Sequence, residues 1–182
     1  PAHPQALRLR GILARDTGNL TLSLALLREA ADVAPADPEP AAELGLTCLA
    51  AGHLAQAEAA LREALTRDPG SRKALANLGA LLQYRGHVQA SLDCHRQVLA
   101  LDPDDPEVRC NLAMTLAEAG RGDEALAECD AGLMRAPGRP DLLATRGAVL
   151  VALGHYAAAI PVLEAALEVA LPAGPDDLAL VN

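Results

Sequence analysis

The sequence predicts an all-α protein, built as a solenoid of five stacked helical hairpins, and three observations support this prediction. The 182-residue chain contains no Trp or Phe and only two Tyr, so its core must be filled by Ala and Leu, which are strong helix formers. Glycine recurs at an interval of 34 residues, and proline keeps the same interval. Between these markers the apolar residues follow the helical period. Self-similarity at a fixed interval of this size is typical of repeat architectures.

One glycine series marks the turn inside each hairpin. Glycine suits the left-handed backbone conformation that ends one helix and lets the next fold back. The members of this series are Gly18, Gly52, Gly86, Gly120 and Gly154. Proline cannot continue a helix, so a proline series is expected to close the second helices. It runs through Pro35, Pro69, Pro103, Pro137 and, one residue late, Pro172.

Another glycine series lies inside the first helix of each hairpin. Glycine there costs about 1 kcal/mol relative to Ala, so we expect a neighbouring helix to approach closely at this position. The series consists of Gly11, Gly45, Gly79 and Gly147, with Ala113 in the remaining unit. In the third unit, Leu75, Leu78 and Leu82 form one apolar helical face, which predicts the core.

The markers predict one domain over residues 1–182. The hairpins are expected at about 4–36, 38–70, 72–104, 106–138 and 140–171. Residues 175–182 are predicted to start a sixth repeat or to form a capping helix. Because the sequence opens at Pro1 rather than at Met, we expect an excised fragment or a processed product.

The unit resembles the tetratricopeptide repeat, whose pattern runs W-x2-L-G-x2-Y, then A-x3-F, then P. Leu78-Gly79 is similar to its Leu-Gly core, Ala57 and Ala125 to its small residue, and Asp68-Pro69 to its closing pair. The resemblance covers roughly residues 4–171 and implies a right-handed superhelix of five tandem repeats. The large aromatic positions of the pattern carry other residues here: Leu7, Ala41, Leu75, Arg109 and Leu143.

The resemblance also implies that the first helices line a concave groove that binds an extended peptide or a protein segment. The residues predicted to face this groove are Arg8, Arg15, Glu43, Lys73, Asn77, Tyr84, Asn111, Met114 and Glu118. Asn77 and Asn111 lie one repeat apart, and an Asn side chain both donates and accepts hydrogen bonds, which suits it to peptide amide groups. The alternative is that both side chains bond a neighbouring helix or face solvent. We expect a groove of mixed charge, with basic character near its N-terminal end and acidic character beyond.

Net charge and missing motifs argue against other functions. A net charge of −9 disfavours nucleic acid and anionic membranes as partners, and no apolar run is long enough to span a bilayer. The sequence contains no phosphate-binding loop, nucleophile elbow or metalloprotease motif. We therefore expect no enzyme activity, no catalytic residue, no metal and no cofactor.

The four cysteines show no paired spacing, so we expect reduced thiols that pack as small apolar side chains in the cytoplasm. They are Cys48, Cys94, Cys110 and Cys129. A metal site that combines Cys94, Cys110 and Cys129 with His95 is the alternative. The spacing of these residues follows no known ligand pattern, and His95 occupies a core-facing position, which favours a packed core histidine.

The leading expectation is a protein-interaction module with a scaffold or adaptor role. The segment Ala76–Gly79 is similar to the repeat arms of glycosyltransferases, so a substrate-recruiting arm of a larger enzyme, of glycosyltransferase, sulfotransferase or hydroxylase type, is an alternative. Self-association through the C-terminal end is a further alternative, because Leu178, Leu180 and Val181 would give a sixth unit an apolar face.

Overall fold

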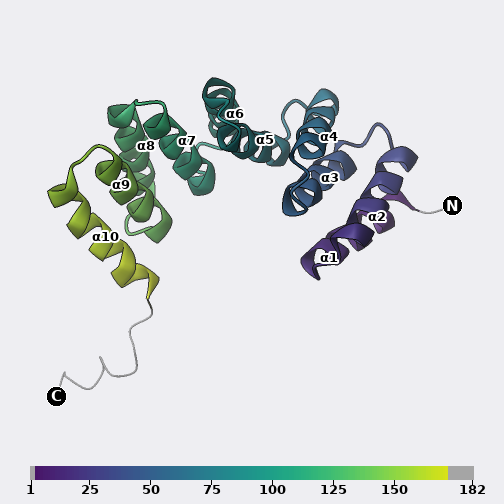
Figure 1. The fold of residues 1–182 in the computed structure, drawn as a ribbon, viewed down its shortest axis with the longest axis horizontal. Coiled ribbons are helices and arrows are strands. Elements are labelled where there is room, and N and C mark those ends of the chain that lie inside the picture. The colour runs from purple at the N-terminus through teal and green to yellow at the C-terminus, as the bar shows by residue number, and fades with distance from the viewer. Residues whose placement is uncertain (1–2, 172–182) are drawn as a thin grey trace, which may run out of the picture. The chain divides into compact units, whose positions relative to one another are not determined.

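The protein is described here by a computed structural model that covers residues 3–171. Every regular element in this span is an α-helix, and the helices follow one another as antiparallel hairpins (Figure 1). They are α1 (Pro4–Asp16), α2 (Leu20–Val33), α3 (Pro38–Ala50), α4 (Leu54–Arg67), α5 (Arg72–Tyr84), α6 (Val88–Leu101), α7 (Pro106–Glu118), α8 (Gly122–Arg135), α9 (Pro140–Ala152) and α10 (Tyr156–Ala170). The predicted start of a sixth repeat at residues 175–182 lies outside the described residues.

The chain divides into two compact units, Pro1–Leu101 and Asp102–Asn182. In the first unit, three hairpins stack in order: α2 packs on α3, and α4 packs on α5. In the second unit, α7 and α8 form one hairpin, α9 and α10 form the next, and α8 packs on α9. Each unit is therefore a short α-solenoid, which confirms the predicted fold class.

The turn glycines adopt the left-handed backbone conformation that the sequence predicts for them. All five have a positive φ, between +73° and +82°, and each lies between the two helices of its hairpin. At the second turn, the His53 amide donates to the Cys48 carbonyl oxygen at 2.8 Å, and the Gly52 amide donates to that of Leu49 at 3.0 Å. These bonds satisfy carbonyl groups at the end of α3 that have no partner within the helix.

The glycines inside the first helices allow the two helices of a hairpin to touch. A Cβ atom placed on Gly11 would lie 2.7 Å from Cγ of Leu27, and one on Gly45 would lie 2.6 Å from Cγ of Leu61. In the fifth hairpin, a Cβ on Gly147 would meet the side chain of Leu163. The close approach that the recurring glycine predicted is confirmed in these hairpins.

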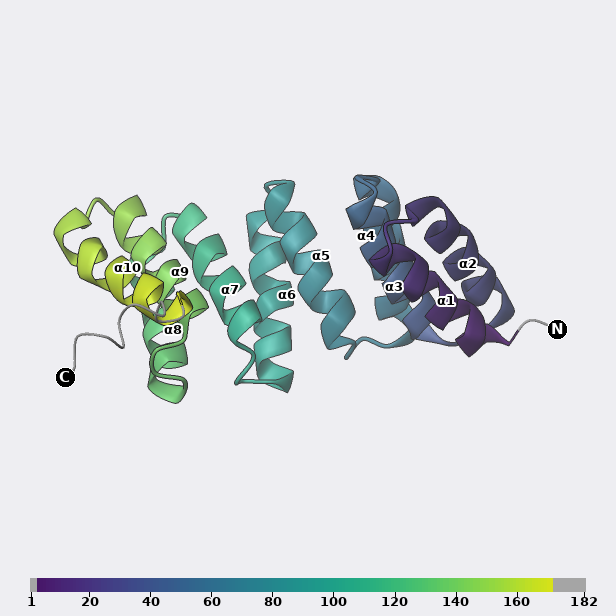
Figure 2. The same ribbon diagram turned by 90° about the horizontal axis from the view of Figure 1, so that it is seen from below.

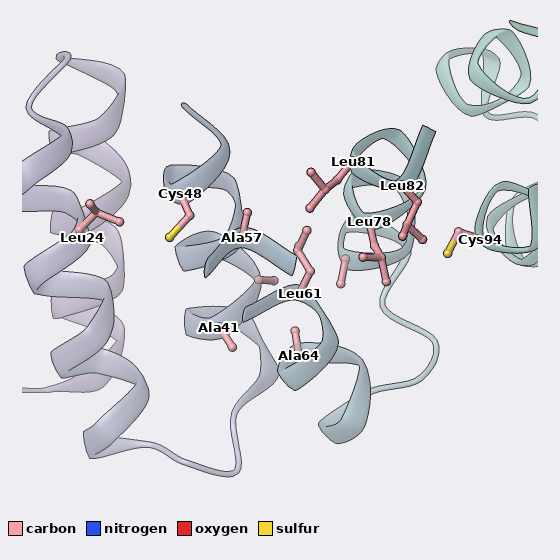
Figure 3. Close-up of a cluster of buried hydrophobic side chains, with 12 residues drawn as sticks. Leu24, Ala41, Cys48, Ala57, Leu61, Ala64, Leu78, Leu81, Leu82 and Cys94 are labelled. Atoms are coloured by element: carbon pink, nitrogen blue, oxygen red, sulfur yellow. The ribbon is translucent and has the colours of Figure 1, made fainter. Parts of the chain in front are cut away.

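The core consists of small and medium-sized apolar side chains. Figure 3 shows Leu61 of α4 together with Leu78 and Leu81 of α5, which meet between the two helices, and all three are at most 4% exposed. Ala57 and Ala64 are fully buried on the same helix as Leu61. Because the core has no Trp or Phe side chains, its helices pack closely against one another.

Candidate functional site

The first helices of the first unit lie next to one another and form one surface. α1 contacts α3, and α3 contacts α5, as Figure 2 shows for α1 and α3. Prolines in the first turn of α1 and α3 fit their helix N-termini, and Asp37 and Ser71 cap α3 and α5 by accepting bonds from backbone amides. Side chains on this surface are therefore held by well-defined helices.

A carboxylate lies at the centre of this surface, between two cations from the neighbouring helices. Oε2 of Glu43 accepts a hydrogen bond from Nη1 of Arg15 at 2.7 Å. Oε1 of the same carboxylate accepts from Nζ of Lys73 at 2.5 Å. The residue Glu43 is only 2% exposed. One carboxylate thus connects α1, α3 and α5.

The position of Glu43 corrects one of our predictions. The sequence placed its side chain in the groove, where a ligand would reach it, but the two cations cover it. Burial alone raises the pKa of the Glu43 carboxyl, and the hydrogen bonds from Lys73 and Arg15 more than offset this, so the net pKa lies below its usual value. Glu43 therefore holds the helices together as an ion.

The charges of this surface alternate along it. Nη1 of Arg8 lies 3.4 Å from Oε2 of Glu39, and Nζ of Lys73 lies 3.9 Å from the same oxygen. Arg8, Arg15 and Lys73 therefore face carboxylates of the chain itself. Within the first unit, the cations and anions of this surface interleave in one network. These pairs connect neighbouring first helices and leave limited free charge for a ligand.

The two other predicted residues of the first unit remain accessible. Asn77 is half-buried, and its Nδ2 donates to the backbone oxygen of Lys73 at 2.7 Å, one turn earlier on α5. This bond orients the amide group on its own helix. Tyr84, at the end of α5, is 79% exposed.

The second unit places three predicted residues on α7. Asn111 and Met114 are half-buried and Glu118 is exposed, and α7 contacts α9 as the neighbouring first helix. On α9, the Asp141 carboxylate accepts from the Arg139 guanidinium, with Nη2 and Oδ2 2.8 Å apart. That hydrogen bond lowers the pKa of the Asp141 carboxyl.

Sequence reasoning missed the role of Arg109. The sequence only showed that a charged residue replaces an aromatic one, and the structure shows how the charge is accommodated. Arg109 is 8% exposed, its Nη1 lies 2.6 Å from Oε2 of Glu128, and its Nη2 donates to the Pro103 carbonyl oxygen at 2.6 Å. The glycine at Gly132 leaves room for its aliphatic stem. The acidic residue Glu128 on the next helix, α8, was the feature of the sequence that could have indicated a partner for Arg109.

The thiols and His95 behave as packed core groups. Cys48, Cys94 and Cys129 are buried, and all four cysteines are free. Burial is the main cause that raises the pKa of each thiol, to about 12 for Cys129. His95 is fully buried, as predicted, and burial lowers its pKa to about 4. Among the described residues, no group of three or more His, Cys, Asp or Glu is arranged to hold a metal ion.

Neither ring nitrogen of His95 has a hydrogen-bond partner among the described residues. The imidazole ring lies next to Gly79 on α5. In other hairpins, a leucine lies next to the equivalent glycine. Among the described residues, none of the helices is both long and apolar enough to cross a bilayer.

Comparison with protein families finds the same repeat three times. Models described as tetratricopeptide repeat match residues 42–82, 85–149 and 140–171. Comparison with curated protein sequences gave no match.

Solved structures with the same fold include MamA and YrrB. One MamA crystal structure has 20% identity, covers 91% of this chain and 91% of its own, and gives a TM-score of 0.77. A MamA RS-1 ArsTM double mutant has 18% identity, covers 91% and 93%, and gives 0.80. YrrB, described as "a TPR protein with an unusual peptide-binding site", has 20% identity, covers 90% and 84%, and gives 0.73. Likeness at this level of identity concerns the fold.

Proposed function

Since this chain belongs to the tetratricopeptide repeat family, we propose that it is a protein-interaction scaffold whose first helices bind an extended peptide or protein segment. The observation that carries the proposal is the adjacency of consecutive first helices, α1 with α3, α3 with α5, and α7 with α9. Adjacent parallel elements present side chains at regular intervals, which suits the regular amide groups of an extended ligand. YrrB, a protein of the same fold, is described as having a peptide-binding site.

Asn77 and Asn111 are the residues that we propose to contact ligand amides. Each is half-buried on a first helix, Asn77 in the first unit and Asn111 in the second. The bond from Nδ2 of Asn77 to its own helix holds the amide group in one orientation. An oriented amide loses little conformational freedom when it binds, which favours affinity.

Tyr84 and Met114 are proposed to give selectivity, because both offer apolar surface on the helices that carry these amides. Tyr84 is largely exposed at the end of α5, and Met114 lies one turn after Asn111 on α7. Arg8, Arg15 and Lys73 are proposed to shape the surface through their bonds to Glu39 and Glu43, with Glu118 as an exposed charge in the second unit. The four free cysteines support the cytoplasm as the location.

Peptide-library panning on the full chain, followed by fluorescence anisotropy with a labelled hit, tests the proposal. Asn77→Ala and Asn111→Ala should each weaken binding by about tenfold, as expected when one hydrogen bond is lost. Gln97→Ala is the matched control, since Gln97 is exposed on the second helix α6. Unchanged affinity in both Asn variants would contradict the groove assignment.

A second candidate function, self-association through the C-terminal end, is favoured by α10. This helix has more exposed large apolar side chains than any other described helix, including Tyr156, Ile160 and Leu167. An apolar surface of this kind is typical of a contact site.

A further inference from the structure

Most of the large exposed apolar side chains of α10 share one side of the helix, with Val169 on another side. They are spaced by four, seven and four residues, which places them along a single stripe. The stripe consists of Tyr156, Ile160, Leu167 and, at the end of the helix, Leu171, each more than half exposed. Ala159 and Ala166 lie on the neighbouring side and are buried.

The same surface of other second helices receives the next hairpin. Leu24 of α2 holds the repeat position of Ile160, and it is buried in a cluster with Ala41 and Ala42 of α3. Leu65 of α4 holds the position of Leu167 and packs against the same cluster, which includes residues of α5. By repeat equivalence, the stripe on α10 is shaped to receive a first helix.

The first helix α1 shows the complementary feature. Leu13 is 64% exposed, whereas Thr47, Leu81 and Val149, which hold its repeat position in α3, α5 and α9, are at most 3% exposed. In α3 the position is buried by the preceding hairpin, because Thr47 Oγ1 lies 3.0 Å from Ser23 Oγ on α2. α1 therefore exposes a surface that these other first helices bury against a second helix.

The charges on the two surfaces are also complementary. In the second unit, Arg146 of α9 bonds Asp130 of α8, with Nε and Oδ1 2.7 Å apart, and this pair links two hairpins. Arg10 of α1 holds the repeat position of Arg146, and Glu164 of α10 holds that of Asp130. Both Arg10 and Glu164 are exposed.

Two other junctions show that these repeat positions face each other. Arg28 and Leu44 line the same pockets between α2 and α3, and Arg62 and Leu78 line an equivalent pocket between α4 and α5.

Ser23 and Thr47 contact each other between α2 and α3. Ala159 on α10 and Leu13 on α1 hold the same two repeat positions. Both residues are apolar, so their contact would leave no buried polar group without a partner.

We propose that copies of this chain associate head to tail, with α10 of one copy packed against α1 of the next and Glu164 paired with Arg10. This proposal rests on the second candidate function, self-association, and names its two surfaces and its ion pair. It is independent of peptide binding on the first helices. The junction repeats, between copies, the packing that joins α8 to α9 within one chain.

Charge reversal on the full chain tests the ion pair. Sedimentation velocity over a concentration series should show concentration-dependent association of the wild-type protein. Arg10→Glu and Glu164→Arg should each weaken association on the order of tenfold or more, because like charges would then face each other. An equimolar mixture of the two variants should restore association. In an alternating assembly, the unaltered Arg10 and Glu164 pair at one junction, and the two reversed charges pair at the next.

Apolar variants test the packing. Leu13→Glu and Ile160→Glu should each abolish association, while Met134→Glu, at a residue that is 84% exposed on α8, should leave it unchanged. All of these residues are exposed, so circular dichroism should show the wild-type helix content for every variant.

Three outcomes would overturn the proposal. A strict monomer at every concentration would remove self-association altogether and leave the peptide-binding proposal standing. Association that is insensitive to Arg10→Glu and Leu13→Glu would show that copies meet through other surfaces. Variants that weaken association singly but are not restored by mixing would exclude the pairing of Glu164 with Arg10.

Discussion

A Cβ atom placed on Gly79 would lie 2.6 Å from Cε1 of His95. The imidazole ring therefore rests where a side chain on α5 would otherwise be. The same relationship joins Gly11 to Leu27 and Gly45 to Leu61. In the fourth hairpin, Ala113 stands at the glycine position, and the smaller Cys129 stands at the position of the partner. Where the first helix of a hairpin carries a methyl group in place of the glycine hydrogen, the facing position on the second helix carries a smaller side chain.

Gly79→Ala should destabilise the protein by about 1–3 kcal/mol through overpacking against His95, although Ala is the better helix former. Urea unfolding followed by circular dichroism measures the change. The double variant Gly79→Ala, His95→Cys recreates the pair found at Ala113 and Cys129, and it should be more stable than the sum of its two single variants predicts. Strict additivity would mean that the two positions do not compete for space.

His95 should make stability depend on pH. Its pKa of about 4 in the folded protein lies below the value of about 6.5 expected when unfolded, so the unfolded state binds a proton first as the pH falls. Between pH 6.5 and 4 the free energy of unfolding should therefore decrease by about 3 kcal/mol from this group. Unfolding at a series of pH values checks this.

His95→Leu is the matched variant, because Leu27 and Leu61 already occupy this position opposite a glycine. It should remove the decrease between pH 6.5 and 4. At pH 7 it should be at least as stable as the wild type, since it replaces a buried ring that has no hydrogen-bond partner among the described residues. A variant that keeps the wild-type pH dependence in this range would assign that dependence to another group.

Glu43→Gln should lower stability at pH 7 by about 1–3 kcal/mol, because Arg15 and Lys73 lose the buried carboxylate between them. The folded pKa of Glu43 lies below its unfolded value of about 4.3, so the stabilisation is present above pH 4.3 and is lost as the pH falls through the folded value. The difference between wild type and variant should therefore shrink toward pH 3 in urea unfolding. Glu63→Gln, which breaks an exposed pair with Arg67, is the control and should cost less than about 1 kcal/mol.

Asn77→Ala should change stability by only about 0.5 kcal/mol, because it removes a partly exposed bond to its own helix. Thermal melts of Asn77→Ala and Gly79→Ala, two residues apart on α5, compare a proposed ligand contact with a packing position. Equal losses would place Asn77 in the core rather than on the binding surface.

Local chemistry made the fold predictable from the sequence. Gly52 predicted the turn between α3 and α4 because few other residues adopt its positive φ, and Pro69 predicted the end of α4 because it cannot continue a helix. Gly79 predicted a close helix contact because glycine in a helix has a cost that packing must offset. Each of these inferences needed only one residue and its recurrence.

The binding surface was less predictable, because its ion pairs join residues from different hairpins. Helical periodicity placed Glu43 on the exposed side of α3, but it contains no information on the reach of Arg15 and Lys73 from the adjacent helices. A bond between residues 28 or 30 positions apart depends on how hairpins stack. Arg109 was likewise visible only as an unusual residue, because its partner Glu128 lies on the second helix of the same hairpin and was not assigned.

The pairing of Gly45 with Leu61 and of Ala113 with Cys129 limits how such a protein can be recombined. A chimera that joins the helix carrying Ala113 to the helix carrying Leu61 would place a methyl group inside a leucine side chain. The reverse chimera, Gly45 with Cys129, would leave a void. A crossover within a hairpin therefore breaks a match that both of its helices encode, whereas exchange of a whole hairpin keeps this match and changes only the contacts between hairpins.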